Sequence, residues 1–149
     1  MVAIPYQEQT YRIIGAAMAV HTELGPGLRE RIYQRALAMK LDEAGIRHDE
    51  EHYVRIELDG ARAGFLYLDH LVEDSVIVEI KARRHPMTND EIGQVVTYLA
   101  ATGYRVGLLL NFGRKSLEYR RILPPREIDS WRNSVGRYLW RPPQSAATP

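Results

Sequence analysis

The spacing of apolar side chains changes along the chain and predicts helices first and strands later. Residues 7–24 have helical spacing, and we expect one buried stripe along them, formed by Ile14, Ala17, Met18, His21 and Leu24. The Gly25-Pro26-Gly27 segment then breaks the chain. A second helix is predicted from about Leu28 to Ala44, because Gly45 suits the left-handed end of a helix.

The middle of the chain alternates between apolar and polar residues and predicts strands. Residues 52–58 and 62–72 are expected to pair, because Asp59-Gly60 between them is a strong hairpin signal. Glu73-Asp74 is predicted to form the next turn. The run SVIVEIKA at 75–82 is apolar on both faces, which is typical of a central strand.

The last part of the fold is predicted to be a helix followed by two strands. Thr88 and Glu91 match a capping box, which begins a helix that stops at Gly103. Strands are expected at 104–111 and 116–122, the second with the alternating charges of an edge strand. Tight turns imply antiparallel pairs, and the intervening helix implies one parallel pair, so the fold class is α/β or α+β with a mixed sheet.

Composition places the chain among soluble globular proteins of one domain. It has 149 residues, of which 45% are hydrophobic and 26% are charged. The absence of cysteine excludes disulfides, thiolate zinc sites and cysteine nucleophiles. The sequence shows neither a targeting signal nor a run of ~18 apolar residues, so we expect a cytoplasmic location and no membrane contact.

Charge is distributed unevenly. Residues 1–103 carry 11 basic and 16 acidic side chains, whereas residues 104–149 carry 9 basic and 3 acidic ones. The C-terminal part could contact a phosphate backbone or be a solvated arginine-rich tail, and charge alone leaves both open. A short helix is expected at 126–139, and the Pro-, Ala- and Ser-rich residues 141–149 are expected to be disordered.

Two charged residues interrupt the predicted central strand. Glu79 and Lys81 are two apart and therefore share a face of a strand that is otherwise apolar. Buried charges are paired or bind an ion. A hairpin turn at Glu73-Asp74 would place Asp69 beside Glu79, and two carboxylates can hold a hard cation such as Mg2+, which lowers the pKa of its water. A structural ion pair of Lys81 with Glu79 or Asp69 explains the same residues.

The order of these motifs resembles the PD-(D/E)XK nuclease superfamily. Asp69 precedes Glu79-Ile80-Lys81, and the next helix carries Gln94 and Tyr98 at a spacing that looks like the RecB-like branch. Gly27, Glu30 and Tyr33 resemble the signature of the bacterial GxxExxY group, and residues 107–113 look like its last core strand. The resemblance covers about residues 8–123 and implies an αβββαβ core, which agrees with the predicted order. Leu68, not proline, precedes Asp69.

The resemblance also implies roles for single residues. The metal ligands would be Asp69, Glu79, the backbone carbonyl of Ile80 and Glu30, with Lys81 as the catalytic lysine. Gln94 would position water, the lysine or a phosphate, supported by Tyr98 one turn on. Tyr33, a neighbour of Glu30 on one helical face, and His21 are further supporting candidates; His21 could donate to a substrate phosphate or orient Glu30. Each of the helical residues also has a simpler interpretation. Gln94 and Tyr98 could form a solvated face, Glu30 could favour a helix N-terminus, and His21 could be a hydrogen-bonded core residue.

The sequence therefore predicts a nuclease that hydrolyses phosphodiester bonds of nucleic acid, DNA in the first place, with Mg2+ or Mn2+. We expect residues 1–123 to form the nuclease-like domain and residues 124–149 to form a basic extension. Nucleic acid would contact Arg83, Arg84, Arg114 and Lys115, although Arg83 and Arg84 could equally lie in a solvated loop. The alternative is a catalytically silent module of the same fold that binds nucleic acid or a protein. A domain this small leaves little room for a specificity lobe, so a homodimer or a protein partner is also considered.

Overall fold

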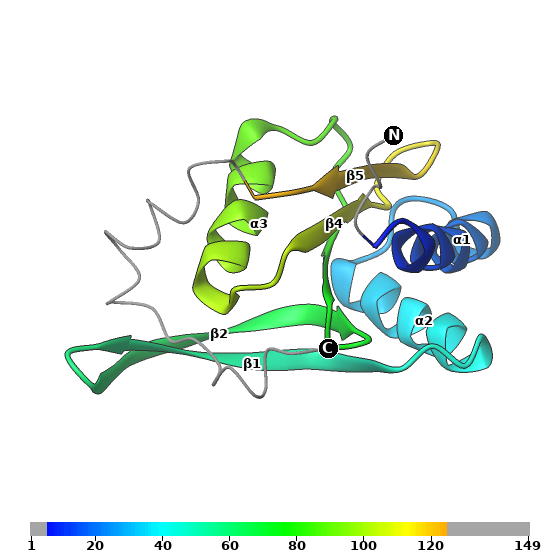
Figure 1. Cartoon of the computed structure of the whole chain (residues 1–149). Coiled ribbons are helices and arrows are strands. Elements are labelled where there is room, and N and C mark those ends of the chain that lie inside the picture. The colour runs from blue at the N-terminus through cyan, green and yellow to red at the C-terminus, as the bar shows by residue number, and fades with distance from the viewer. Residues whose placement is uncertain (1–5, 125–149) are drawn as a thin grey trace, which may run out of the picture.

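A computed structural model of the chain describes residues 6–124, which form helices on both sides of a five-stranded sheet (Figure 1). The elements are α1 (Gln7–Leu24), α2 (Glu30–Glu43), β1 (His48–Leu58), β2 (Ala61–Val72), β3 (Val76–Lys81), α3 (Asn89–Thr102), β4 (Val106–Asn111) and β5 (Glu118–Ile122). The order agrees with the prediction. The helix expected at 126–139 and the tail at 141–149 lie outside the described residues.

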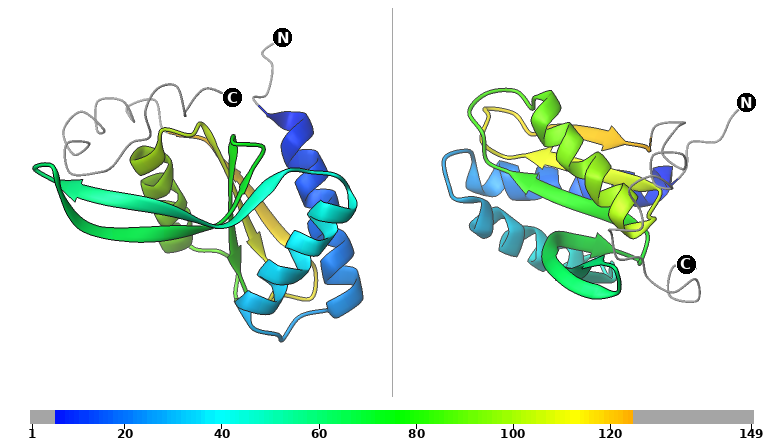
Figure 2. Two further views of the ribbon diagram at one scale, coloured as in Figure 1. Left: turned by 90° about the horizontal axis from the view of Figure 1, so that it is seen from below. Right: turned by 90° about the vertical axis from the view of Figure 1, so that its left-hand side faces the viewer.

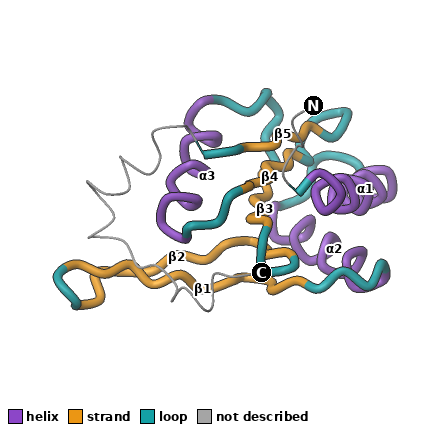
Figure 3. The backbone as a smooth tube through the Cα atoms, viewed as in Figure 1, coloured by secondary structure: helices purple, strands orange, loops and turns teal. Residues whose placement is uncertain are grey.

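The sheet has the strand order β1-β2-β3-β4-β5, with β3 at its centre and β5 at an edge (Figure 3). Strands β3 and β4 are parallel and are joined through α3, and the other neighbours are antiparallel. The mixed sheet, the central strand and the edge strand are thus confirmed. Both residues of the Asp59-Gly60 turn have positive φ, as a type I′ hairpin turn requires, and so do both residues of Glu73-Asp74.

Two layers of helices bury the two faces of the sheet. Helices α1 and α2 cover one face and α3 covers the other (Figures 1 and 2). Tyr33 and Leu37 of α2 belong to one buried cluster with Val78, whereas Leu99 of α3 belongs to a second with Ile77. All residues of β3 and β4 are buried as a result, which explains why both read as continuous apolar runs. None of the helices within residues 6–124 is long and apolar enough to cross a membrane.

The buried side of α1 differs from the prediction. Its buried residues are Thr10, Ile13, Ala17 and Val20. Of the stripe predicted from Ile14, Ala17, Met18, His21 and Leu24, only Ala17 is fully buried, and Met18 and Leu24 are exposed. The helix carries apolar or small residues around most of its circumference, so their spacing does not select one face. Packing against α2 and the sheet selects it.

The strands of the sheet part at one point and create a fork. Strand β2 pairs with β3 only through His70↔Val78, Leu71↔Ile77 and Val72↔Val76, whereas it pairs with β1 along most of its length. Residues 52–68 therefore leave the sheet as a two-stranded hairpin, which we call the hairpin arm (Figure 2). Asp69 and Glu79 are the next positions in register, so both lie where the strands separate.

Candidate active site

Asp69 and Glu79 lie at the fork between β2 and β3. Asp69 Oδ2 accepts the backbone N–H of Ile80 at 2.7 Å, so its side chain provides the acceptor that a longer β2–β3 ladder would have provided. The Glu79 side chain is buried, with only 6% of the residue exposed. Its Oε1 atom has no hydrogen-bond partner within the described part of the chain. An unpaired buried carboxyl oxygen is costly in a folded protein and calls for a missing partner.

Burial and proximity make the charged form of both acids unfavourable. Burial first and the neighbouring Asp69 carboxylate second raise the pKa of Glu79 to about 8, although Lys81 opposes the shift. Burial also raises the pKa of Asp69, against the effect of the Ile80 N–H. The two carboxyl groups lie close enough to share a hydrogen bond. At neutral pH the ion-free pair therefore keeps a proton between two potential ligands.

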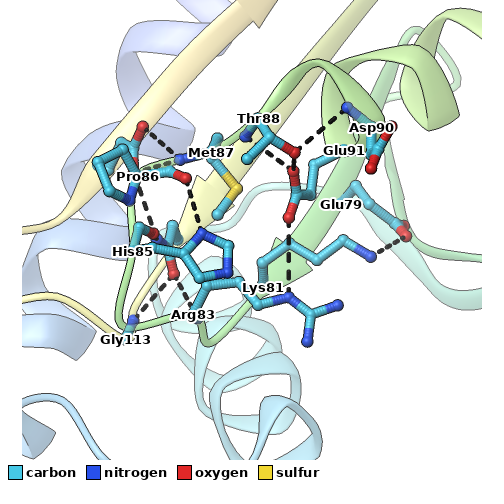
Figure 4. Close-up of polar contacts among 12 residues, drawn as sticks. Glu79, Lys81, Arg83, His85, Pro86, Met87, Thr88, Asp90, Glu91 and Gly113 are labelled. Atoms are coloured by element: carbon cyan, nitrogen blue, oxygen red, sulfur yellow. Dashed lines mark hydrogen bonds and ion pairs between the residues drawn. The ribbon is translucent and has the colours of Figure 1, made fainter.

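Lys81 lies on the same face of β3 as Glu79 and points toward it (Figure 4). Its Nζ atom is 3.8 Å from Glu79 Oε2, and its side chain is 11% exposed. This ion pair is the one that the simpler interpretation of the sequence expected. The contact is long for a hydrogen bond and leaves Glu79 Oε1 unpaired. An ion pair alone therefore does not satisfy the site.

The donor set of the fork fits a hard divalent cation. Carboxylate oxygens are the ligands that Mg2+ takes in proteins, and Mg2+ is commonly held by one or two carboxylates together with several waters. Within residues 6–124, no three acidic or histidine side chains come close enough to hold an ion together. Asp69 and Glu79 thus fit an ion that keeps part of its water shell, and not one enclosed by protein ligands alone.

Glu30 lies on the cleft that opens beside the fork. This cleft has a volume of about 570 Å³ and is lined by Leu28, Arg29, Glu30, Arg31, Gln34, Glu51, Asp69 and Ala82. Glu30 is the first residue of α2, and its charge adds slightly to the raised pKa of Asp69. The structure therefore places Glu30 on the same cleft as Asp69 but outside any group of three acids.

Sequence reasoning missed two residues of this cleft, Gln34 and Glu51. Glu51 occupies the β1 position that faces Asp69, between the pairs Glu50↔His70 and His52↔Leu68. It has a left-handed backbone with φ 56°, which is uncommon for a residue other than glycine. Gln34 Nε2 lies 3.4 Å from Glu51 Oε1. Neither residue belongs to a motif, so only the three-dimensional arrangement identifies them.

Gln94 and Tyr98 form a polar pair on α3, above the face of the sheet that carries Glu79. Gln94 Nε2 donates to the Tyr98 hydroxyl at 2.9 Å, and both side chains are partly buried. Burial, together with the charges of Glu79 and Asp69, raises the pKa of Tyr98 to about 12. The pair therefore lies close enough to the two acids for their charges to affect the pKa of Tyr98.

Tyr33 and His21 hold the segments around the cleft. The buried Tyr33 hydroxyl donates to the Gly25 carbonyl at 2.5 Å and accepts the Leu28 N–H at 3.1 Å. It thereby fixes the turn that leads into Glu30. His21 Nε2 lies 2.8 Å from the Arg114 carbonyl and connects α1 to the turn after β4. The hydrogen-bonded role considered for His21 is thus what the geometry provides.

The basic candidates come from two neighbouring loops at the end of the sheet that carries Lys81. Asn111 Oδ1 accepts the backbone N–H groups of Arg83 and Gly113, at 2.8 and 3.1 Å, and so connects the loops. A side chain on Gly113 would lie 2.5 Å from the backbone of Ala82 and Arg83. Figure 4 shows Gly113 against Arg83. Arg83 is 3.9 Å from Glu91, Arg114 is 3.8 Å from Glu118, and Arg84 and Lys115 are exposed.

Comparison with known proteins agrees with the fold. A model of the PD-(D/E)XK nuclease superfamily matches residues 7–122. The chain belongs to this superfamily. The GxxExxY group and the RecB-like branch stay predictions.

One solved structure shares the fold at low sequence identity. The crystal structure of SSO0001 superposes with a TM-score of 0.52 and 14% identity, over 88% of this chain and 66% of that one. The chain thus spans just under two thirds of SSO0001. An alkaline exonuclease (LHK-Exo) from Laribacter hongkongensis gives a TM-score of 0.44 and 17% identity, over 90% of this chain and 77% of that one. No curated protein sequence matched the chain.

Proposed function

We propose that the chain is a divalent-metal-dependent nuclease that hydrolyses phosphodiester bonds, with Asp69, Glu79 and Lys81 at its centre. The observation that carries the proposal is the buried, unpaired oxygen of Glu79 beside Asp69, with a buried lysine 3.8 Å from the other oxygen. Membership of a nuclease superfamily supports nucleic acid as the substrate, and we take DNA as the first candidate.

Asp69 and Glu79 would hold Mg2+ or Mn2+, with the Ile80 carbonyl and Glu30 as further ligands. When bound, the ion would supply a water of lowered pKa and neutralise charge on the phosphate. The proton that the two acids share must leave before both can serve as ligands. Binding of the ion should therefore tighten as the pH rises toward the pKa of Glu79, which is about 8.

The remaining residues would act on substrate and water. Lys81 Nζ, beside the acids, would orient the attacking water or a phosphate oxygen. Gln94 would do the same from α3, with Tyr98 fixing its amide. Arg83, Arg84, Arg114 and Lys115 would contact the phosphate backbone at the end of the sheet. We assign residues 1–123 to the nuclease domain and residues 124–149 to a basic extension that adds phosphate contacts.

Cleavage of labelled DNA and RNA, each single- and double-stranded, tests this function in Mg2+, in Mn2+ and in EDTA. Asp69→Asn and Lys81→Met should lower the rate about 100-fold or more, because the first removes a charged ligand of the ion and the second removes a positive charge beside the reacting phosphate. Lys40→Met is the matched control, since Lys40 pairs with Glu23 and Glu43 on the helices and not with the fork. Equal rates for wild type and both site variants would refute the assignment.

Calorimetry separates the enzyme from a silent binding module. Wild type should bind Mg2+ or Mn2+, and Glu79→Ala should not. If neither protein binds an ion, even with an oligonucleotide present, the chain is better described as a non-catalytic module of the nuclease fold.

A further inference from the structure

Three exposed aromatic side chains line one face of the hairpin arm. Tyr53, Phe65 and Tyr67 are 43%, 50% and 51% exposed, and their ring centroids lie 5.5 to 5.7 Å apart. We call these three residues the aromatic row. The opposite face of the arm carries Val54 and Leu68, which are buried in the cluster that includes α3. The arm is thus already packed by its other face, and the fold does not require the aromatic row.

The aromatic row leads to the fork. Phe65 and Tyr67 alternate along β2 and share one face of that strand, and Asp69 follows Tyr67 by two residues. Tyr53 faces Tyr67 across the two strands, and Glu51 precedes Tyr53 by two residues on β1. Positions two apart on a strand are about 6.7 Å from each other. The aromatic row is therefore separated by a short stretch of strand from Glu51 and Asp69, which line the cleft.

Positive charge lies beside the aromatic row and also in the cleft. The Arg62 guanidinium lies over the Phe65 ring, 4.8 Å from its centroid, at the outer end of the arm. Arg29 and Arg31 line the cleft at the inner end. Aromatic rings between cations are the arrangement that binds single strands, because bases stack on the rings while the backbone meets the charges.

We propose that the aromatic row binds unpaired nucleotides and guides them into the fork, so that the substrate is single-stranded nucleic acid or a single-stranded end. This inference rests on the proposed nuclease function, because β2 leads from the row to Asp69. Unpaired bases are favoured over a duplex because their faces are free to stack, whereas bases within a duplex already stack on one another. If the row instead bound a protein partner or a second copy of the chain, it would give no preference for single-stranded over double-stranded nucleic acid.

Fluorescence anisotropy in EDTA tests the row without cleavage. The probes are a labelled oligothymidylate, an abasic oligonucleotide and a duplex, all of the same length. Wild type should prefer the oligothymidylate to both other probes. Phe65→Leu and Tyr67→Leu should each weaken its binding about 5- to 100-fold, because each removes one stacking partner. Tyr67→Phe should bind like wild type, since the ring remains.

Tyr119→Leu is the matched control, because Tyr119 is 46% exposed but lies on β5, at the other edge of the sheet. Leucine keeps apolar bulk on the arm, and urea unfolding verifies that each variant is folded. Equal affinity of wild type and both arm variants for the oligothymidylate would overturn the inference. So would equal binding of the abasic probe, or self-association in sedimentation that the arm variants abolish. Because no ion is present, these results stand apart from the cleavage rates of Asp69→Asn and Lys81→Met.

Discussion

Glu79 combines deep burial, a neighbouring carboxyl group and an unpaired oxygen, and each of these disfavours its charged form. A side chain selected only for stability would be apolar here, like Val78 and Ile80 beside it. The fold instead carries an acid whose ionisation costs folding free energy. Such a cost in folding free energy is expected where a side chain binds an ion instead of packing in the core.

Glu79→Gln should stabilise the ion-free protein at pH 8. The folded pKa of Glu79, about 8, lies above its ordinary value of 4.5. The folded state therefore holds more protons than the unfolded state between these values, so stability is lost as the pH rises through that window. Glutamine removes this loss, which amounts to at most about 4 kcal/mol at pH 8. Urea unfolding in EDTA measures the change.

The partly exposed Glu57, which pairs with Arg55 on the arm, provides the control substitution. Glu57→Gln should leave the difference in stability between pH 5 and pH 8 as it is in wild type. An equal pH dependence of wild type and Glu79→Gln would show that Glu79 ionises normally in the fold.

His70 should make the protein sensitive to acid. Its side chain is fully buried, its Nε2 lies 3.0 Å from the Gln34 carbonyl, and burial lowers its pKa to about 4. Between pH 6.5 and 4 the unfolded chain binds a proton that folded His70 does not, so stability present above pH 6.5 is lost as the pH falls. The loss by pH 5 is about 2 kcal/mol.

Urea unfolding of wild type and His70→Gln at pH 7.5 and pH 5 isolates this contribution. The variant is less stable at both values, because a buried contact changes, but it should lose less stability on acidification. A decline as steep as that of wild type would assign the acid sensitivity to other groups.

The sequence predicted correctly those elements that a local signal determines, such as a helix cap or a tight turn. The Thr88 and Glu91 capping box is present at the start of α3, and the Asp59-Gly60 turn joins β1 to β2. The stripe on α1 was wrong because its spacing fits more than one face. Strand β1 begins at His48, four residues before the predicted start, because the polar run HDEE gives no strand signal. Pairing with Leu71 and Val72 of β2 makes it a strand.

The residues of the candidate site also divide into those that local sequence patterns predict and those that only tertiary packing brings together. Asp69, Glu79 and Lys81 were predictable together because alternation along a strand fixes the face, and a hairpin fixes the register. The cleft residues Gln34 and Glu51 were not, since they come from α2 and β1 and reach Asp69 only through tertiary packing. The fork itself depends on where β2 stops pairing with β3, and no sequence pattern marks that position.

Gly113→Ala should disturb the connection between the loops that follow β3 and β4. The added methyl group would lie 2.5 Å from the backbone of Ala82 and Arg83, so one loop must shift. We expect a loss of about 1–3 kcal/mol in the free energy of unfolding. Cleavage should also fall, because that loop begins directly after Lys81, the last residue of β3.

Gly93→Ala is the control, because Gly93 lies inside α3 with no atom near the added carbon. Alanine there should stabilise the helix by about 0.5–1 kcal/mol. Two variants of equal stability in urea would show that the backbone at Gly113 yields without cost.

At the scale of the whole molecule, one sheet carries two cores. The cluster under α1 and α2 includes Leu37, and the cluster under α3 includes Leu99, yet β3 and β4 contribute to both. If either helical layer unfolded, it would expose strands against which the other layer packs. We therefore expect one cooperative unfolding transition.

Leu37→Ala and Leu99→Ala test this coupling from opposite faces. Each should cost about 2–5 kcal/mol, because each empties a fully buried position. Each should also lower amide protection in both helical layers, as measured by hydrogen exchange in dilute urea. Loss of protection confined to the mutated layer would show that the two cores unfold independently.

The parting of β2 from β3 also has a consequence for protein engineering. The outer end of the hairpin arm is held mainly by its own two strands, and its tip at Asp59-Gly60 projects away from the sheet (Figure 1). Exposed loop tips of this kind tolerate inserted sequences. A recognition peptide or a small folded module inserted between Asp59 and Gly60 should therefore leave the fork intact, and would make the arm a permissive position for redirecting the domain to chosen targets.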